Sequence, residues 1–330
     1  MGEPAGIGPE VIVKALSDPV LRHKAHFIIY GMNELLHYAA DIAEFDVFWW
    51  RDQYNGRLRN YPHDVVVVDY DQYSMLGTAI RAPSKMGGEA SMRFCLDAID
   101  AANRKLVDGI VTGPIAKQSW KLAGFHFPGH TELFAQRTNT RRFAMMFAGG
   151  PLKVVLATVH IPLMGLWGKL NIGAVFQPIE LVHQALVEWF DIPKPRIAVC
   201  GLNPHNGDNG SCGREELDII APAVKRLQQQ GMRVAGPFPA DTIFLKVQGE
   251  NKEYDAIVTM YHDQGQIAMK LMGFWRGVTV QGGLSIPIAT TAHGTGFDIV
   301  GKGRANPGSL RQAFAVVCRM ARTRQQAAAR

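Results

Sequence analysis

The chain has 330 residues and a formal net charge of +6, with 47% hydrophobic and 19% charged residues. This is the composition of a globular protein, and the length exceeds the size at which one hydrophobic core stops growing, so we expect two domains. The basic residues are dispersed and form no continuous stripe of the kind that binds a duplex. We therefore expect an acidic small molecule, and no nucleic acid, as the partner.

The four cysteines form no CxxC pair and no dense framework, which is typical of the reducing cytoplasm. No apolar run approaches the roughly 18 residues that span a bilayer. The N-terminus also lacks a basic segment followed by an apolar stretch. We expect a soluble, cytoplasmic protein without disulfides or membrane contact.

The chain opens with GEPAGIGPEVIVKAL, which predicts a glycine-rich loop and then a helix with Pro9 in its first turn. Such loops normally follow a strand, so the sequence leaves open whether residues precede Met1. Backbone N–H groups near Gly2, Gly6 and Gly8 could approach a phosphate or carboxylate at the helix start. A tight turn is the alternative, because the pattern matches neither GxGxxG nor the P-loop.

Short β-rich runs then alternate with longer helical patterns. In the first half we predict strands in AHFIIYG, DVVVVDY and VDGIVTG, with a helix over 88–104. In the second half we predict strands in LKVVLATVH, RIAVCGLNPH and YDAIVTM, with helices over 178–190 and 215–230. This alternation is typical of parallel sheets covered by helices.

Three histidines stand just past the ends of three of these strands: His160 closes VVLATVH, His205 ends RIAVCGLNPH and His262 follows YDAIVTM. Ligands of open α/β sheets bind at the carboxyl ends of the strands, where side chains from separate βα units converge. Neutral imidazole suits Zn, Fe, Ni or Cu. Taken singly, each histidine is better explained as a polar residue at a strand boundary, but the threefold pattern favours a divalent-metal site.

Several longer motifs carry a family resemblance. The segment AHGTGFDIVGKGRANPGS, residues 292–309, resembles the adenine-side cofactor loop of the isocitrate and isopropylmalate dehydrogenase superfamily, and the opening loop is similar to that superfamily's first loop. With VTGPIAK, FPGHTELF, CGLNPHNGDNG, PFPADTIF and MYHDQGQIAMK, the chain resembles, over essentially its whole length, the 4-hydroxythreonine-4-phosphate dehydrogenase family of vitamin B6 synthesis.

The resemblance implies the two-domain α/β fold of the isocitrate and isopropylmalate dehydrogenases, with mostly parallel sheets, helices on both faces and a cleft between the domains. The cofactor-side domain would comprise residues 1–125 with 294–330. The metal-binding and dimerisation domain would comprise residues 126–293. The resemblance also implies a homodimer, with cofactor and substrate in the cleft of each subunit.

For the metal, the resemblance implies a site held by His160, His205 and His262, the third ligand being supplied across the dimer interface. Such a site leaves positions open for a substrate hydroxyl and carboxylate. Zinc is the first choice, with Mg, Co and Mn as alternatives. The dinucleotide, NAD or NADP, would contact His293, Gly294, Thr295, Asp298 and Asn306.

Substrate contacts implied by the resemblance are His130, Thr131, Lys270 and Thr279, and Lys270, Asp241 and Asp263 are the candidate catalytic groups. Each has a simpler alternative. His130 and Thr131 could form the N-cap region of a helix that begins near Glu132. Lys270 could be a solvated lysine, and the two aspartates could form turns, caps or supports for metal ligands.

The chain departs from the family pattern at three positions, where Thr279, Ile288 and Ala292 stand in place of an asparagine, a phosphate-binding arginine and an aspartate. Isoleucine offers no donor to a phosphate, whereas the arginine fork matches its geometry. Whether the substrate carries a phosphate at this end is therefore left open by the sequence. The substitutions are compatible with relatives that oxidise phosphate-free substrates, such as the cis-dihydrodiol dehydrogenases of aromatic-acid breakdown.

We expect an NAD- or NADP-linked, metal-dependent dehydrogenase that oxidises and decarboxylates 4-phosphohydroxy-L-threonine or a close analogue. Oxidation of a cis-dihydrodiol carboxylate is the first alternative. A sensor that binds metal or dinucleotide without turnover is the second, although retention of all three histidines disfavours it. Zinc-dependent hydrolysis is the third, and it leaves the segment 293–306 unexplained.

Overall fold

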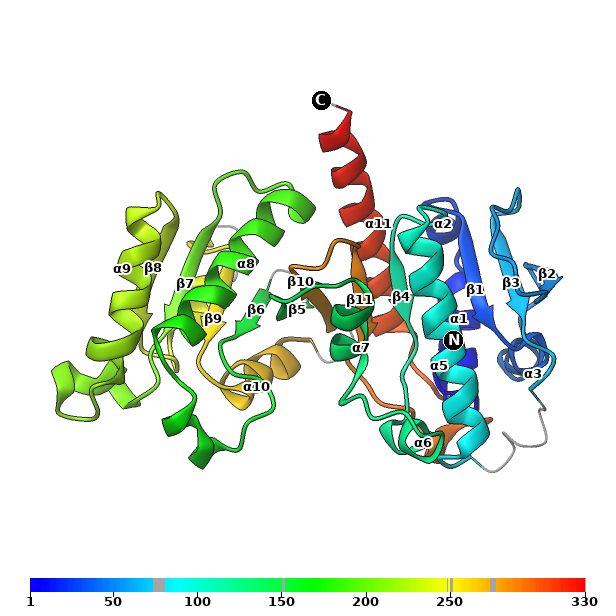
Figure 1. Cartoon of the computed structure of the whole chain (residues 1–330), viewed down its shortest axis with the longest axis horizontal. Coiled ribbons are helices and arrows are strands. Elements are labelled where there is room, and N and C mark those ends of the chain that lie inside the picture. Colours follow the sequence, from blue (N-terminus) through cyan, green and yellow to red (C-terminus); the bar gives the residue numbers. More distant parts are fainter. Residues whose placement is uncertain (74–80, 150–151, 248, 250–251, 274–276, 330) are drawn as a thin grey trace. The chain divides into compact units, whose positions relative to one another are not determined.

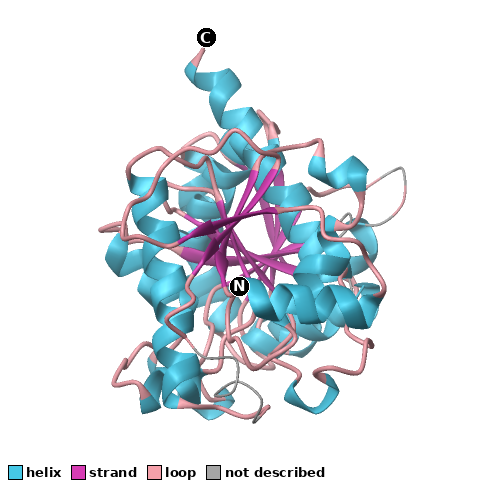
Figure 2. Ribbon diagram, turned by 90° about the vertical axis from the view of Figure 1, so that its right-hand side faces the viewer, coloured by secondary structure: helices cyan, strands magenta, loops and turns pink. Residues whose placement is uncertain are grey.

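The structure, a computed structural model, describes residues 1–73, 81–149, 152–247, 249, 252–273 and 277–329. The chain divides into two units: unit 1 is Met1–Asn139 with Ser285–Ala321, and unit 2 is Thr140–Leu284 with Arg322–Arg330. Each unit contains strands accompanied by helices (Figure 1), and the strands and helices are coloured by type in Figure 2. The predicted α/β fold class is confirmed.

Unit 1 contains a three-stranded parallel sheet of order β1-β3-β2. Its strands are β1 (Phe27–Gly31), β2 (Trp50–Gln53) and β3 (Val65–Asp69). The central strand has the sequence VVVVD and every residue in it is buried, as expected for a parallel strand covered on both faces. A second parallel pair joins β4 (Ile110–Thr112) to β11 (Ile288–Thr291), with Thr112 opposite Thr290.

The helices of unit 1 bury their apolar faces against these strands. Nearly all of α1 is buried, and its Val11 and Leu16 belong to one core cluster with the valines of β3. The helices that begin in this unit are α1 (Gly8–Leu16), α2 (Pro19–Arg22), α3 (Asn33–Ala43), α5 (Lys85–Asn103), α6 (Lys117–Leu122), α7 (His130–Arg137) and α11 (Gly308–Ala328), with a short 3₁₀ turn η6 (Phe297–Ile299).

In unit 2 the strand order is β10-β5-β6-β9-β7-β8. The strands are β5 (Ala144–Gly149), β6 (Leu152–Leu156), β7 (Arg196–Cys200), β8 (Arg233–Phe238), β9 (Ala256–Thr259) and β10 (Val278–Gly282). Strand β5 is antiparallel to β10 and β6, whereas β6, β9, β7 and β8 run parallel. Three neighbouring strands, β6, β9 and β7, therefore end at the same edge of the sheet.

The α-helices of unit 2 are α8 (Ile172–Phe190), α9 (Ala221–Gln229) and α10 (His262–Gly273). Shorter helical segments are the 3₁₀ turns η1 (Leu163–Gly168), η2 (Pro204–Gly210) and η4 (Ile243–Val247) and the π-helical turn η3 (Glu216–Ile220). Within the described part of the chain, no helix has both the length and the hydropathy that a membrane span requires.

Two predicted helices differ in extent from the observed ones. The helix expected from Pro178 begins at Ile172, because Asn171 caps it by accepting a hydrogen bond from the Ala174 N–H (3.0 Å), and Pro178 lies inside it. The single helix expected over 215–230 is a π-helical turn followed by α9. Proline at position 222 has no N–H to donate, which is consistent with the change of helix type there.

Close packing of α5 on α6 gives a first prediction. A Cβ on Gly88 would lie 2.0 Å from the backbone oxygen of Ser119, so Gly88→Ala should lower the free energy of unfolding by about 1–3 kcal/mol. Gly168→Ala is the control, since a Cβ there meets nothing within 4 Å. Thermal unfolding followed by circular dichroism checks both; equal melting temperatures for the two variants would contradict the packing.

Candidate functional site

His160 and His262 lie just beyond the ends of β6 and β9, which are neighbours in the unit 2 sheet. The two strand ends are joined by Thr158, whose hydroxyl and backbone N–H both donate to the backbone oxygen of Met260, at 2.7 and 3.2 Å. The imidazole ring centres are 6.0 Å apart, with an angle of 37° between the ring planes. The structure thus brings two of the three predicted metal ligands together.

This separation fits a shared metal ion. Two imidazoles on one tetrahedral zinc have ring centres roughly 5 Å apart, because the Zn–N bond is about 2.0–2.1 Å long. His262 Nδ1 lies 2.7 Å from Asp263 Oδ1, an interaction that directs the proton to Nδ1 and leaves Nε2 available as a ligand. The donor chemistry and the orientation of this pair therefore suit zinc or a similar ion.

His205 is held on a separate loop after β7. It begins a run of residues with left-handed backbone, from His205 (φ 50°) to Asn209 (φ 52°), that places the imidazole in an exposed position. Asn, Asp and Gly dominate this run, and these are the residues that tolerate left-handed geometry. Among the described residues no group of three or more His, Cys, Asp or Glu side chains forms a metal site, so His205 does not join the other two within one chain.

Two polar side chains that the sequence did not single out shape this region, the buried Glu216 and the partly exposed Gln264. Glu216 is 2% exposed and accepts hydrogen bonds from the backbone N–H groups of Leu202 (2.6 Å) and Asn203 (2.7 Å) at the base of the His205 loop. Gln264 accepts from the Met260 N–H (2.7 Å) and donates to the Gly201 oxygen (2.9 Å), which ties the end of β9 to that of β7. A buried Glu is the signal that could have indicated such a role.

The remaining predicted residues of unit 2 are distributed around the same strands. Lys270 is exposed on α10, eight residues after His262, and Thr279 is buried in β10. Asp241 is exposed between β8 and η4, and Asp263 is 74% exposed beside His262. Of these, Asp263 makes a hydrogen-bond contact with a predicted ligand, His262.

In unit 1, His130 and Thr131 are the first two residues of α7. The alternative that they form its N-cap region is wrong, because the N-cap residue is Gly129, which has no side chain to accept a hydrogen bond. His130 packs between Trp120 and Phe134, with ring centres 5.7 and 5.8 Å away. Burial, assisted by nearby positive charges, lowers the pKa of His130 to about 3. Its Nε2 is buried with no hydrogen-bond partner among the described residues, so a neutral imidazole nitrogen is left for a ligand.

The predicted cofactor residues form one loop of unit 1. The Thr295 oxygen accepts a hydrogen bond from the Ile7 N–H (2.8 Å), so the loop is joined to the glycine-rich segment before α1. His293 Nδ1 lies 3.0 Å from the Gly294 oxygen, and its Nε2 is a second buried nitrogen without a partner in the part of the chain that the structure describes. Asp298 is exposed in η6, and Asn306 accepts from the Gly308 N–H (2.8 Å) at the start of α11.

A cavity of about 230 Å³ lies between this loop, the segment before α1 and helix α3. Its lining is largely apolar, with Glu10, Tyr38 and Arg81 as the polar exceptions; the residues are Pro4, Ala5, Gly6, Ile7, Pro9, Glu10, Leu35, Tyr38, Ala39, Ile42, Arg81, Val300 and Gly301. A Cβ on Gly6 would lie 2.9 Å from the Thr295 oxygen. Glycine here permits the close approach of the two loops.

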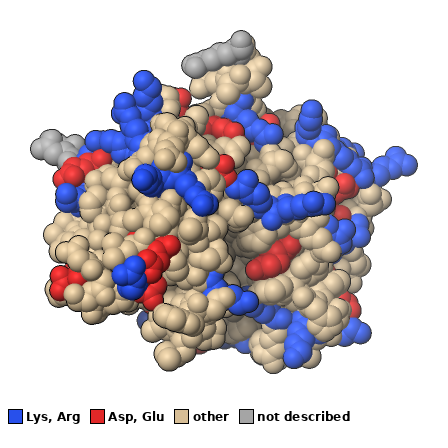
Figure 3. Space-filling model, turned by 60° about the vertical axis from the view of Figure 1, so that its left-hand side comes forward, with Lys and Arg blue, Asp and Glu red and all other residues tan. Residues whose placement is uncertain are grey.

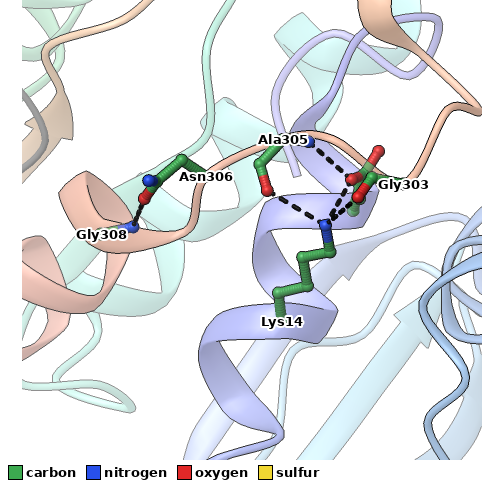
Figure 4. A network of polar contacts seen from close by, with 6 residues as sticks. Lys14, Gly303, Ala305, Asn306 and Gly308 are labelled. Atoms are coloured by element: carbon green, nitrogen blue, oxygen red, sulfur yellow. Dashed lines mark hydrogen bonds and ion pairs between the residues drawn. The ribbon is translucent and has the colours of Figure 1, made fainter.

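Lys14 and Glu10 of α1 also contact this loop, and the sequence did not single them out (Figure 4). The Lys14 ammonium donates to Glu10 Oε1 (2.7 Å) and to the oxygens of Gly303 (2.7 Å) and Ala305 (3.1 Å). Glu10 Oε1 also accepts from the Ala305 N–H (2.8 Å). A Glu and a Lys four residues apart in an otherwise apolar, buried helix is the signal that could have indicated buried partners.

Comparison with known proteins places the chain in a family. The family model described as "Pyridoxal phosphate biosynthetic protein PdxA" matches residues 23–317. A 4-hydroxythreonine-4-phosphate dehydrogenase from Desulforapulum autotrophicum is 42% identical over 313 residues, covering 94% of this chain and 91% of the relative.

Solved structures agree with the sequence relatives. A 4-hydroxythreonine-4-phosphate dehydrogenase from Klebsiella pneumoniae has a TM-score of 0.84 and 33% identity, covering 97% of this chain and 96% of the other. A terephthalate 1,2-cis-dihydrodiol dehydrogenase from Burkholderia xenovorans has a TM-score of 0.64 and 27% identity, covering 96% and 95%. By the family match and the identity of its relatives, the chain belongs to the PdxA family of pyridoxal phosphate biosynthetic proteins.

Proposed function

We propose that this protein is a metal-dependent, NAD- or NADP-linked dehydrogenase that oxidises the secondary alcohol of 4-phosphohydroxy-L-threonine or a close analogue. The neighbouring carboxylate leaves as carbon dioxide once the alcohol has become a ketone. The observation that carries the proposal is the pair His160 and His262, 6.0 Å apart at the ends of two parallel strands, in a chain whose relatives are named for this oxidation.

The metal is held by His160, His205 and His262, with zinc as the first candidate and Mg, Co or Mn as alternatives. His205 belongs to a different loop from the close pair, and the described residues of one chain form no three-ligand group. The proposal includes a homodimer in which one of the three imidazoles is supplied across the subunit interface. A bound divalent metal lowers the pKa of a hydroxyl that it coordinates, which an alcohol needs before it can lose hydride at neutral pH.

The protein's own side chains orient a metal ligand, anchor the substrate and transfer protons. Asp263 binds His262 through Nδ1, which leaves Nε2 as the nitrogen that would bind the metal. Lys270, a flexible cation on the exposed face of α10, anchors the substrate carboxylate or returns a proton to the product. Asp241 is the alternative acid or base. In the predicted division of the chain, these groups lie in the metal-binding domain, residues 126–293.

The cofactor-side domain, residues 1–125 with 294–330, would hold the dinucleotide, which would supply the hydride acceptor. Support comes from the loop that carries His293, Gly294, Thr295, Asp298 and Asn306, and from the largely apolar cavity of about 230 Å³ beside it. His130, Thr131 and Thr279 complete the substrate contacts. A cytoplasmic location, inferred from the cysteine usage, belongs to the same proposal.

A second candidate substrate is a phosphate-free cis-dihydrodiol carboxylate. Ile288 is fully buried in β11 and Ala292 has no polar side chain, so neither position offers a cation or donor to a phosphate. A relative of this overall structure is a terephthalate cis-dihydrodiol dehydrogenase. The surface view in Figure 3 shows Lys and Arg side chains dispersed among acidic and uncharged ones, in keeping with a small-molecule ligand.

Reduction of NAD⁺ and NADP⁺ by the purified, metal-loaded protein tests the activity and the substrate together. We expect NADH or NADPH formation with 4-phosphohydroxy-L-threonine, and a kcat/KM lower by about tenfold or more with the unphosphorylated amino acid, since charged hydrogen bonds to a phosphate contribute about 1.5–3 kcal/mol. Turnover of the cis-dihydrodiol alone would move the assignment to the second substrate. Absence of turnover with every substrate would refute the dehydrogenase.

Substitution of the histidines tests the metal site. We expect His160→Ala and His262→Ala each to remove bound metal and to lower kcat/KM by at least about a hundredfold. Loss of a residue that only supports a metal ligand already lowers activity by about tenfold to a hundredfold, and loss of the ligand itself should cost more. Metal analysis of the purified variants, beside assays of turnover, checks this. The control is His26→Ala, which changes an exposed histidine of unit 1 and should retain both the bound metal and the activity. Full activity of His262→Ala without metal would refute the mechanism.

The buried imidazole of His130 predicts a pH dependence of stability. Its pKa falls from 6.5 to about 3 on folding, so the unfolded chain binds a proton that the folded chain does not between these values. Stability should therefore decrease as the pH falls from about 6.5 towards 3, and His130→Phe should weaken this decrease. Melting temperatures across this range, with the exposed His126→Phe as control, measure the effect; identical slopes for wild type and His130→Phe would contradict it.

A further inference from the structure

We propose that Glu10 and Lys14 are positioning residues that fix the backbone of residues 303–306 for the dinucleotide. This inference rests on the proposed function, because it takes that segment as part of the cofactor loop. The two residues belong to α1, almost 300 positions earlier in the chain. Their contacts are with backbone groups, so they act on the shape of the loop and not on the ligand directly.

The ammonium of Lys14 has its hydrogen-bonding capacity filled. It has three N–H donors, and the structure gives it three acceptors: Glu10 Oε1 and the backbone oxygens of Gly303 and Ala305. Two of these acceptors lie in the loop, two residues apart. One cation therefore fixes the direction of two backbone carbonyl groups of the loop.

Glu10 holds the same segment by accepting a hydrogen bond from its backbone. Its Oε1 accepts from both Lys14 Nζ (2.7 Å) and the Ala305 N–H (2.8 Å), and the side chain is only 6% exposed. Ala305 is thus held through its N–H and its oxygen by the two members of one ion pair. In this low-dielectric setting, hydrogen bonds to charged groups are stronger than those between neutral groups.

The geometry of the loop matches this role. Gly303 has a left-handed backbone (φ 64°), so its oxygen is directed to Lys14 from a conformation that other residues adopt at a cost. Asn306, a predicted cofactor contact, follows Ala305 directly and accepts from the Gly308 N–H (2.8 Å). Glu10 also lines the cavity of about 230 Å³ beside the loop. Release of Ala305 would therefore shift Asn306 and one wall of the cavity.

The variants separate positioning from stability. Lys14→Met leaves Glu10 with an unpaired buried charge, which destabilises a fold. The double variant Glu10→Met with Lys14→Met removes both charges, so it avoids the unpaired buried charge of the single variant while leaving Ala305 and Gly303 without these partners. Lys85→Met is the matched control, because it removes an exposed pair with Glu89 (3.8 Å) on α5, also a Glu and a Lys four residues apart.

Hydrogen exchange gives a readout that needs no turnover. In the double variant we expect amides of residues 303–306 to exchange at least about tenfold faster than in wild type, with exchange in α5 unchanged. The Lys85→Met control should match wild type throughout. Equal exchange in wild type and the double variant would overturn the proposal.

Dinucleotide affinity gives the second readout. We expect the dissociation constant of the preferred dinucleotide to rise about tenfold to a hundredfold in the double variant, with kcat at saturation and the KM of the acidic substrate within about twofold of wild type. Faster exchange with unchanged affinity would overturn the positioning role. If the wild-type protein binds neither NAD⁺ nor NADP⁺, the cofactor assignment fails instead, and exchange alone decides whether the pair holds the loop.

Discussion

The parallel arrangement of β6, β9 and β7 is the constraint on which the candidate metal site depends. Neighbouring parallel strands end at the same edge of the sheet. The residues that follow these strands therefore lie in one region, whatever their separation in the chain. His160 and His262 are 102 positions apart, yet their rings lie 6.0 Å from one another. The double hydrogen bond from Thr158 to Met260 extends the strand pairing past the last ladder residues and reduces the freedom of both loops.

Both candidate sites use a buried carboxylate to hold a loop by its backbone. Glu216 accepts from Leu202 and Asn203 beneath His205, and Glu10 accepts from Ala305 beside the cofactor loop. A loop of Gly and Asn has little apolar surface to pack, so it cannot be ordered by the hydrophobic effect alone. A charged acceptor inside the fold replaces that packing, since backbone N–H groups without partners are costly to bury.

The sequence indicated those features that depend on local pattern. The valine run of β3 and the strands before His160 and His262 are short and mostly apolar with many β-branched residues, and this composition identifies them. Strand β2, with the sequence WRDQ, is mostly exposed and polar and carries no such pattern. The spacing of Glu10 and Lys14 in an apolar helix could have indicated buried partners. Which backbone groups they bind, and which ones Glu216 binds, no local pattern reveals, because those groups lie in other parts of the chain.

The burial of Ile288 bears on how the substrate's distal end is recognised. A fully buried isoleucine in β11 is part of the core of unit 1, where an arginine in its place would have to be desolvated without a partner. In this protein the side chain at position 288 therefore serves packing and offers no donor to a ligand. If the substrate carries a phosphate, its contacts must come from cations elsewhere in the chain or from backbone N–H groups. Substrate choice in this protein thus depends on residues other than those that define it in the family pattern.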